Sequence, residues 1–250
     1  KDWSRNNLHG RIHGPNVRFA EDEKFGRVLV LPGDGQSYVS IPDESLEGEE
    51  SLSITAWVNM QSTASGQRLF DFGKDDRTHL FVAPLGTKEK EGFQAVIIKD
   101  DKKAYEANLP ATKMDTDQWV HIAVVLDIPS KSMNTYINGE QVGKAENMEM
   151  ELGQLFTHEN QLYIGKSIAS GGTYLNAKIH DFRLYRTPLS EKQIARIRYI
   201  ALRGGDGVAQ REKPENDLPK FAPNTPQLYN AYLTGVSDIE VETEVGFLPR

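Results

Sequence analysis

Short runs in which apolar and polar residues alternate recur along this chain as far as Thr187, and no other feature constrains the fold as strongly. Alternation with a period of two puts every second side chain on one face of a β-strand, as in the run from Ser53 to Val58. The runs that predict strands are residues 27–31, 38–41, 52–60, 68–72, 80–82, 93–99, 104–108, 119–127, 133–137, 161–164 and 177–185. Short strands of this number and spacing predict an all-β sandwich or jelly roll.

Turn and helix signals divide the alternating runs. The dipeptide Asn138-Gly139 stands between two such runs and predicts a tight β-hairpin, because both residues tolerate a positive φ. One helix is predicted near the end of the sandwich, where Ser190 and Gln193 have the spacing of a capping box. Isoleucines at helical spacing follow, and Gly204 ends the pattern. The sequence therefore predicts a β sandwich closed by one short amphipathic helix.

Composition excludes several classes of protein. The chain has 250 residues, 38% hydrophobic residues, no cysteine and a formal net charge of −7 at pH 7. A chain of this length buries a sizeable core, so that folding requires neither a disulfide nor a metal. Without cysteine there is no thiolate metal site and no cysteine nucleophile. The acidic balance disfavours nucleic acid as a partner, and the apolar runs are far shorter than the roughly 20 residues of a membrane span.

The composition changes after Arg203. Residues 204–220 contain a Gly-Gly pair, prolines and many charged residues, which is typical of a linker. Apolar residues alternate again between Ile239 and Val241, as at the start of a strand. We therefore predict a jelly-roll domain over residues 1–203, followed by a linker and the start of a second domain over residues 204–250.

Motifs spread over the first 200 residues together carry a family resemblance. They are Asp2–Gly10, Phe25–Leu29, Gly33–Pro42, Leu52–Val58, Arg68–Gly73, Trp119–Val124, Tyr136–Gly139, Tyr163–Ser167 and Ile179–Tyr185. In their order and spacing they resemble the LamG-like jelly rolls of the concanavalin A-like lectin and glucanase superfamily. Arg5 and Ala177 depart from the family pattern, which usually has glycine at both positions.

The resemblance implies an all-β, concanavalin A-like jelly-roll sandwich of two antiparallel sheets with one short C-terminal helix. Jelly rolls with this pattern are attached to secreted bacterial glycoside hydrolases, such as β-L-arabinofuranosidase-type enzymes. The chain is therefore expected to be a non-catalytic accessory module that is secreted, periplasmic or at the cell surface of a bacterium. Its expected partners are a polysaccharide or oligosaccharide and neighbouring domains of a larger chain. Two alternatives stay open: a glycoside hydrolase acting on plant or host polysaccharide, and a purely structural or protein-interaction spacer.

The same resemblance implies one structural calcium ion near an edge of the sandwich. Calcium takes hard oxygen ligands, and glycine-rich turns let such ligands converge. The expected ligands are Asp34, in the Gly33-Asp34-Gly35 turn, and Asp181, in the closing strand, with Asp2 and Asn6 as second choices. The alternative interpretation is that Asp34 forms a turn and that Asp181 accepts a hydrogen bond between strands.

A carbohydrate site needs aromatic rings that stack on sugar C–H groups and polar side chains that bind hydroxyls. Asp71 and the neighbouring His79 are candidates for the polar part, on a surface formed by two paired strands. Tyr174 lies in a glycine-rich segment and is the candidate surface aromatic. Trp57 and Trp119 are expected to fill the core between the sheets instead.

Catalytic signals are weak. Retaining glycosidases place two carboxylates about 5 Å apart across the scissile bond. The nearest candidates are Glu149 and Glu151, which would share one face of a strand but follow a hairpin and lack a neighbouring aromatic ring. They are interpreted as a solvated sheet edge. His9 and His13 are four residues apart, but the segment around them is turn-rich and contains Gly10 and Gly14, so that a zinc-binding helix is not indicated.

Overall fold

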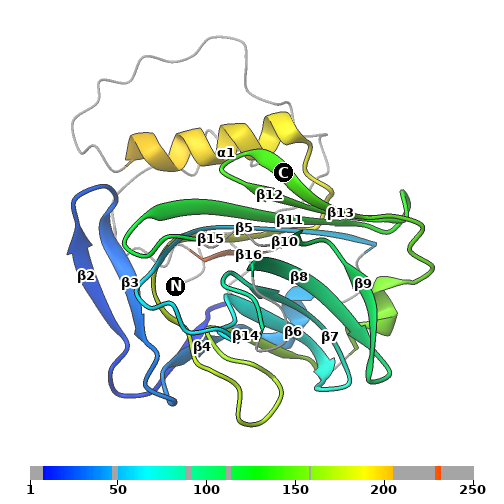
Figure 1. The fold of residues 1–250 in the computed structure, drawn as a ribbon, viewed down its shortest axis with the longest axis horizontal. Coiled ribbons are helices and arrows are strands. Elements are labelled where there is room, and N and C mark those ends of the chain that lie inside the picture. Colours follow the sequence, from blue (N-terminus) through cyan, green and yellow to red (C-terminus); the bar gives the residue numbers. More distant parts are fainter. Residues whose placement is uncertain are drawn as a thin grey trace.

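The computed structural model of the chain describes residues 8–46, 50–87, 92–110, 114–157, 159–204 and 229–231, and it shows a sandwich of two antiparallel sheets. Figure 1 shows the two layers with α1 (Glu191–Gly204) lying along the outer side of one of them. The sheet that α1 covers is called the upper sheet, and the other is called the lower sheet. The predicted jelly-roll fold class is confirmed.

The lower sheet forms one wall of the sandwich. Its strands, in spatial order, are β1 (Arg11–His13), β4 (Tyr38–Ser40), β14 (Gln161–Ile164), β6 (Phe70–Asp75), β7 (Thr78–Ala83), β8 (Gly92–Lys99) and β10 (Leu109–Pro110), with β9 (Lys102–Glu106) also paired to β8. Strands that are neighbours in space come from distant parts of the chain, since β4 pairs with β14 and β14 pairs with β6. Such long-range pairing is typical of Greek-key jelly rolls.

The upper sheet forms the other wall. Its strands, in spatial order, are β13 (Glu140–Ala145), β12 (Ser132–Ile137), β11 (Trp119–Asp127), β5 (Ser51–Met60), β15 (Asn176–Tyr185), β3 (Gly26–Pro32) and β2 (Arg18–Asp22), with β16 (Tyr229–Ala231) also paired to β15. Two short 3₁₀ helices, η1 (Asp43–Leu46) and η2 (Leu152–Gln154), complete the described elements.

The core lies between the two sheets, where alternate side chains of each strand meet. Leu52, Ile54 and Val58 of β5 belong to this core, and so do Phe70 and Phe72 of β6. The intervening residues of each strand point to the outer faces, as a period of two requires. The alternation in the sequence therefore sets which side chains are buried between the sheets and which are available for other contacts.

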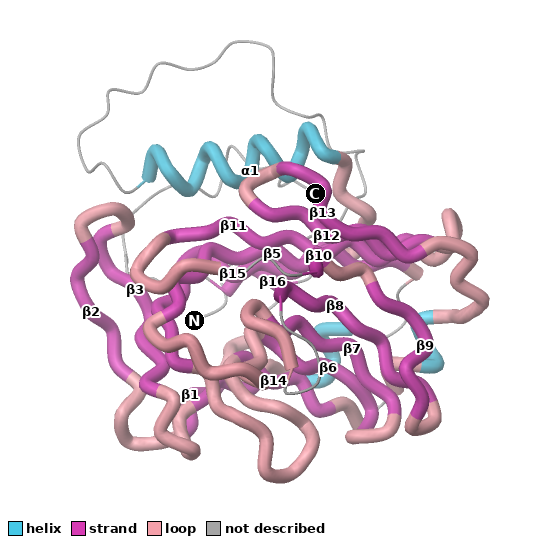
Figure 2. The backbone as a smooth tube through the Cα atoms, viewed as in Figure 1, coloured by secondary structure: helices cyan, strands magenta, loops and turns pink. Residues whose placement is uncertain are grey.

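α1 packs on the outer face of the upper sheet. Ile194 and Ile197 are buried against Ala123 and Tyr185 of that face. The capping box is present, because the Ser190 backbone N–H donates to Gln193 Oε1 and the Gln193 N–H donates to Ser190 Oγ. Figure 2 shows this helix lying over the strands of the upper sheet. No helix among the described residues is long and apolar enough to cross a bilayer.

Trp57 does not lie in the core between the sheets, which corrects the prediction. It is 1% exposed and packs with Phe25, Val28 and Ala201 in a second cluster between the upper sheet and α1. Trp119 packs against the same cluster. The reason is the strand alternation: Ala56 and Val58 point inward, so that Trp57 between them points outward.

Strand prediction succeeded where buried apolar residues recur and failed for strands with few of them. The predicted strands 119–127 and 161–164 coincide with β11 and β14. β1 and β2 were not predicted, because their apolar residues are few and both strands are largely exposed or half-buried. Within the segment predicted as linker and second domain, Tyr229–Ala231 forms β16 beside β15, and most of the remainder of that segment lies outside the described residues.

Candidate functional site

The outer face of the lower sheet carries a row of side chains that crosses five strands. Tyr163 of β14 lies opposite Ser40 of β4 and Asp71 of β6, and Asp71 lies opposite Phe81 of β7. Phe81 in turn lies opposite Val96 of β8. Directly opposed residues in antiparallel strands point to the same face, so that these side chains lie on one face of the lower sheet.

Aromatic rings gather at one end of this surface. Tyr38 lies 5.3 Å from Tyr163 and 6.2 Å from Tyr174 between ring centroids, and both contacts are T-shaped. These three residues, all half-buried, are called the tyrosine cluster. The imidazole of His13 stacks on the ring of Tyr38, with the centroids 4.3 Å apart. The cluster therefore joins three separate segments of the chain into one aromatic surface.

Polar groups border the tyrosine cluster. His13 Nε2 lies 2.8 Å from Ser40 Oγ, and the Tyr163 hydroxyl donates to Gln161 Oε1 at 3.3 Å. The pKa of Tyr174 is raised by partial burial, by the neighbouring Tyr38 and by the charge of Asp34. The Tyr174 hydroxyl therefore stays protonated at neutral pH and can both donate and accept hydrogen bonds.

Asp71 holds the neighbouring loop in place from beneath the surface. Its Oδ1 lies 2.5 Å from Nδ1 of His79, while its Oδ2 accepts hydrogen bonds from Ser167 Oγ and from the Ile168 N–H, both at 3.1 Å. The side chain of Asp71 is 0% exposed. A buried carboxylate is stable only when it is hydrogen-bonded in this way.

The loop that Asp71 holds runs from Gly165 to Leu175 and is called the 165–175 loop. Gly165 has φ +85°, and a Cβ there would collide with the Leu31 side chain, so that glycine is required. The Leu175 N–H donates to the Gly165 carbonyl at 2.9 Å and closes the loop. The loop carries Lys166 near its start and Tyr174 near its end, so that its closure brings both to the tyrosine cluster.

The predicted carbohydrate-binding residues lie in one region but differ in exposure. The structure brings Asp71 and His79 together and connects them to the loop that carries Tyr174. Asp71 and His79 are 0% and 5% exposed, which differs from the expectation that they form the polar contact surface. Sequence reasoning missed Tyr38 and Tyr163. The sequence signal for these two tyrosines is their position in the strands: each is next to a core residue, Val39 or Ile164, and therefore points to the outer face. That the two strands are neighbours is set by the tertiary fold.

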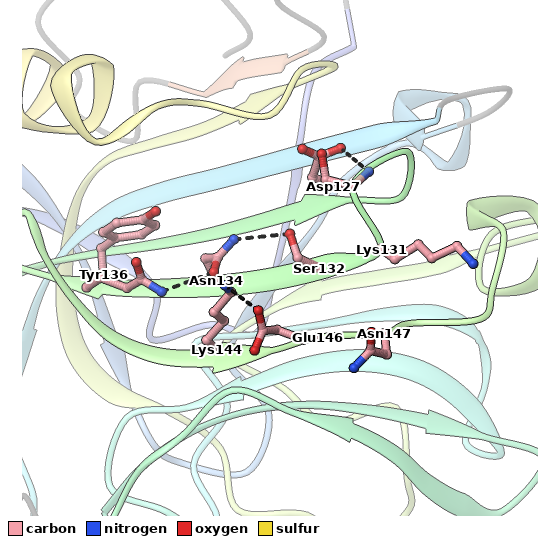
Figure 3. A pocket seen from close by; sticks show the side chains of 10 residues that line it. Asp127, Lys131, Ser132, Asn134, Tyr136, Lys144, Glu146 and Asn147 are labelled. Carbon is pink, nitrogen blue, oxygen red and sulfur yellow. Dashed lines mark hydrogen bonds and ion pairs between the residues drawn. The ribbon is translucent and has the colours of Figure 1, made fainter.

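A separate depression of about 510 Å³ lies on the outer face of the upper sheet, beside α1. Figure 3 shows its polar lining on and around β12 and β13. The groups there bind each other: Asn134 Nδ2 donates to Ser132 Oγ at 3.3 Å, and Gln141 Nε2 donates to Asn134 Oδ1 at 3.1 Å. Tyr136 is 6% exposed and packs against α1. Without an exposed ring this depression suits a sugar less well than the tyrosine cluster does.

Asp34 forms a network of hydrogen bonds within its own turn. Its carboxylate, at the turn after β3, accepts hydrogen bonds from Asn16 Nδ2, from the backbone N–H groups of Gln36 and Ser37, and from the Ser37 hydroxyl, at 2.8–3.0 Å. Partial burial raises the pKa of Asp34, but these hydrogen bonds outweigh it and lower the pKa to about 2. Donors on both oxygens stabilise the carboxylate in the turn, as the alternative interpretation of Asp34 expects.

Asp181 lies in a different environment. It is 2% exposed, has φ 52° at an irregularity in the pairing of β15 with β5, and pairs with Arg183 at 2.7 Å. Asp34 follows the end of β3, where Pro32 pairs with Asn176 of β15. Asp181 lies five residues further along β15 than Asn176, so that the structure does not bring the two aspartates together. Among the described residues no group of three or more acidic or histidine side chains could hold a metal. Calcium binding at Asp34 and Asp181 stays a prediction.

The carboxylates considered for hydrolysis lie at an exposed edge. Glu149 accepts a hydrogen bond from Lys131 Nζ at 2.8 Å, which lowers the pKa of Glu149. Glu149 and Glu151 also line a small depression of about 320 Å³ with Met148 and Met150. A general acid in a glycosidase needs a raised pKa, so that the direction of this shift is opposite to the one required.

Comparisons with known proteins agree with the fold. A family model described as the concanavalin A-like lectin/glucanases superfamily matches residues 33–195. No curated protein sequence matches the chain. Among solved structures, domain 4 of the extracellular GH43 arabinanase AbnA from Geobacillus stearothermophilus, in complex with arabinotriose, is similar with a TM-score of 0.60 and 20% identity, over 78% of this chain and 90% of that one.

Two botulinum neurotoxin structures are similar over a smaller share of their own length. The binding domain of botulinum neurotoxin serotype D/C VPI 5993 has a TM-score of 0.58 and 18% identity, over 78% of this chain and 47% of that one. A botulinum neurotoxin type C structure, described as dependent on two ganglioside molecules for cell entry, has a TM-score of 0.57 and 18% identity, with the same coverage. At such identities the likeness establishes a shared fold.

Proposed function

The chain belongs to the concanavalin A-like lectin/glucanases superfamily, and from this membership we propose that it is a non-catalytic carbohydrate-binding module of a larger, secreted bacterial protein that acts on polysaccharide. The observation that carries the proposal is the tyrosine cluster on the outer face of the lower sheet. Tyr38, Tyr163 and Tyr174 are each half-buried, so that their rings contact one another while each residue stays partly exposed.

Tyrosine suits this role for a physical reason. A ring held by its neighbours loses little entropy on binding, and its hydroxyl can bind a sugar hydroxyl while its face meets C–H groups. Asp71 and His79 contribute by positioning the 165–175 loop. A shallow surface with three rings predicts weak affinity, with a Kd on the order of 0.1–1 mM.

The arabinanase domain that shares this fold was solved with arabinotriose, which makes arabinan a rational first ligand. In the full protein such a module would hold a neighbouring catalytic domain near its polymer. This role would place the chain outside the cell, in the periplasm or at the bacterial surface.

The test is affinity electrophoresis and calorimetry with a broad panel of plant-wall and host glycans. Tyr174→Ala removes one ring of the cluster from a loop, and we expect it to weaken binding by about ten-fold or more. Tyr199→Ala, at the 46% exposed tyrosine of α1, is the matched control and should bind as the wild type does. Absence of binding by the wild-type protein across the panel would overturn the proposal.

A further inference from the structure

A lysine covers two rings of the tyrosine cluster. Lys166 Nζ lies 4.6 Å from the ring centroid of Tyr38 and 4.5 Å from that of Tyr163. Both distances are within the range of a cation–π interaction. Within the part of the chain that the structure describes, no carboxylate lies within 4.0 Å of this ammonium group. A ligand that approaches the rings therefore meets a positive charge that lacks an anionic partner.

A second cation lies on the same face. Arg11 of β1 is opposite Ser40, which is itself opposite Tyr163, so that the three side chains point to the same side of the sheet. Arg11 is exposed. Its charge and that of Lys166 both act on His13, whose pKa is lowered first by burial and then by these two cations. His13 is consequently neutral at pH 7, and the positive charge at the cluster comes from Arg11 and Lys166.

The carboxylates nearest the cluster already have partners. Asp71 is fully buried and accepts hydrogen bonds from Ser167, Ile168 and His79. Asp34 is exposed, and its charge reaches Tyr174, but both of its oxygens accept hydrogen bonds within its own turn. The tyrosine cluster is therefore a locally cationic surface on a protein whose net charge is −7.

This arrangement discriminates between ligands. A neutral sugar that stacks on Tyr38 or Tyr163 has to displace the ammonium of Lys166 from the ring. A sugar that bears a carboxylate can pair with the ammonium and still place its ring against the tyrosines, because a charge-assisted hydrogen bond forms where the cation already lies. We propose that the tyrosine cluster binds acidic glycans through their uronic acid residues, with Lys166 and Arg11 as the carboxylate-binding residues. This inference rests on the proposed carbohydrate-binding function and specifies its ligand class.

The test compares each acidic polymer with its own neutral counterpart. Polygalacturonate and alginate are offered to the wild-type protein beside the same polymers after chemical reduction of their carboxyl groups, and neutral arabinan completes the set. We expect the wild-type protein to bind at least one acidic polymer about three- to ten-fold more tightly than its reduced form. We also expect this preference to shrink at high salt, since exposed charges are screened.

Variants assign the preference to residues. Lys166→Gln removes the charge and should bring the affinity for the acidic polymer down to that for its reduced form, and Arg11→Gln should lower it in part. Lys144→Gln is the matched control, because Lys144 is an exposed lysine on the upper sheet that pairs with Glu146. Thermal melting of each variant, compared with that of the wild type, shows that the fold is retained.

The outcomes separate the inference from the proposed function. Tyr174-dependent binding that is equally strong for neutral and acidic polymers would overturn the inference and leave the carbohydrate-binding function standing. A preference for acidic polymers that survives both Lys166→Gln and Arg11→Gln would overturn it as well. Failure to bind any glycan, acidic or neutral, would remove both.

Discussion

Nδ1 of His79 lies 2.5 Å from Oδ1 of Asp71, and this buried contact is one end of a chain of hydrogen bonds that leads to the binding surface. The other oxygen of Asp71 binds Ser167 and Ile168 in the 165–175 loop. The loop in turn carries Lys166 and Tyr174. The buried Asp71–His79 pair therefore positions the loop that contributes Lys166 and Tyr174 to the binding surface.

Replacement of Asp71 tests this positioning role. Asp71→Ala leaves the His79, Ser167 and Ile168 donors without their acceptor, and each buried unpaired polar group costs about 1–3 kcal/mol. We expect the free energy of unfolding to fall by about 2–4 kcal/mol, as measured by urea denaturation. Asp71→Asn keeps one acceptor oxygen and should lose less. Unfolding of Asp71→Ala at the same urea concentration as the wild type would contradict the role.

Two buried histidines predict a loss of stability in mild acid. His121 and His180 lie opposite Trp57 on the strands that flank it, and both are buried on the α1 side of the upper sheet. Burial lowers the pKa of His121 to about 3 and that of His180 to about 4, and Asp181 offsets this only in part. Below about pH 6.5 the unfolded chain gains protons that the folded chain does not, so that stability falls with pH toward about 4.

The measurement is the free energy of unfolding between pH 7 and pH 4.5. We expect each histidine to contribute a loss of up to about 3 kcal/mol as the pH falls through this range. His121→Phe and His180→Phe remove the titrating groups and should flatten the profile. An unchanged slope in both phenylalanine variants would show that other groups govern the acid response.

The Asn138-Gly139 hairpin was predictable from two residues, and its geometry yields a third test. Asn138 has φ 53° and Gly139 has φ 89°, as a type I′ turn requires. A Cβ at Gly139 would meet no closer neighbour than Arg198 at 3.9 Å, so that Gly139→Ala is strained by its backbone angle and not by crowding. We expect a loss of about 1 kcal/mol in unfolding free energy. Gly153→Ala, with open space around it and no positive φ, is the control and should change little.

Local sequence determined the strands and the helix, but it did not determine the binding surface. The alternation in residues 119–127 and the Ser190 capping box each depend on neighbours in sequence, and both were predicted. Tyr38 and Tyr163 meet because β4 pairs with β14, more than a hundred residues later in the chain. No local pattern specifies that pairing. The strand positions of Tyr38 and Tyr163 indicated an outward direction, but only Tyr174 of the tyrosine cluster was predicted as a site residue.

Trp57 shows the same limit in the packing of the core. The alternation shows that Trp57 points to the opposite face of the strand from Ala56 and Val58. Because this sheet is covered on both faces, both faces carry apolar residues, and the sequence pattern does not show which face meets the other sheet. The sequence predicts α1, and the isoleucines of α1 need an apolar surface to pack against. The tertiary fold determines which face of β5 the helix covers. Trp57 lies on that face and is therefore buried between the upper sheet and α1.

The turn at Asp34 gives the final prediction, on calcium. Because its carboxylate accepts hydrogen bonds from Asn16, Gln36 and Ser37, we expect Asp34→Ala to lower the unfolding free energy by about 1 kcal/mol, a value discounted for exposure of the side chain to solvent. The pKa of Asp34 is lowered to about 2, so that its contribution is present above about pH 4 and is lost as the pH falls toward 2.

Melting in excess calcium and in excess EDTA separates the two roles of Asp34. If the carboxylate acts through its turn, Asp34→Ala should melt below the wild type by the same interval in both solutions. Asp34→Asn, which keeps an acceptor for the Gln36 and Ser37 N–H groups, should recover part of the loss. A difference between wild type and Asp34→Ala that appears in calcium and disappears in EDTA would instead make Asp34 a calcium ligand, because a bound ion stabilises the folded state by mass action.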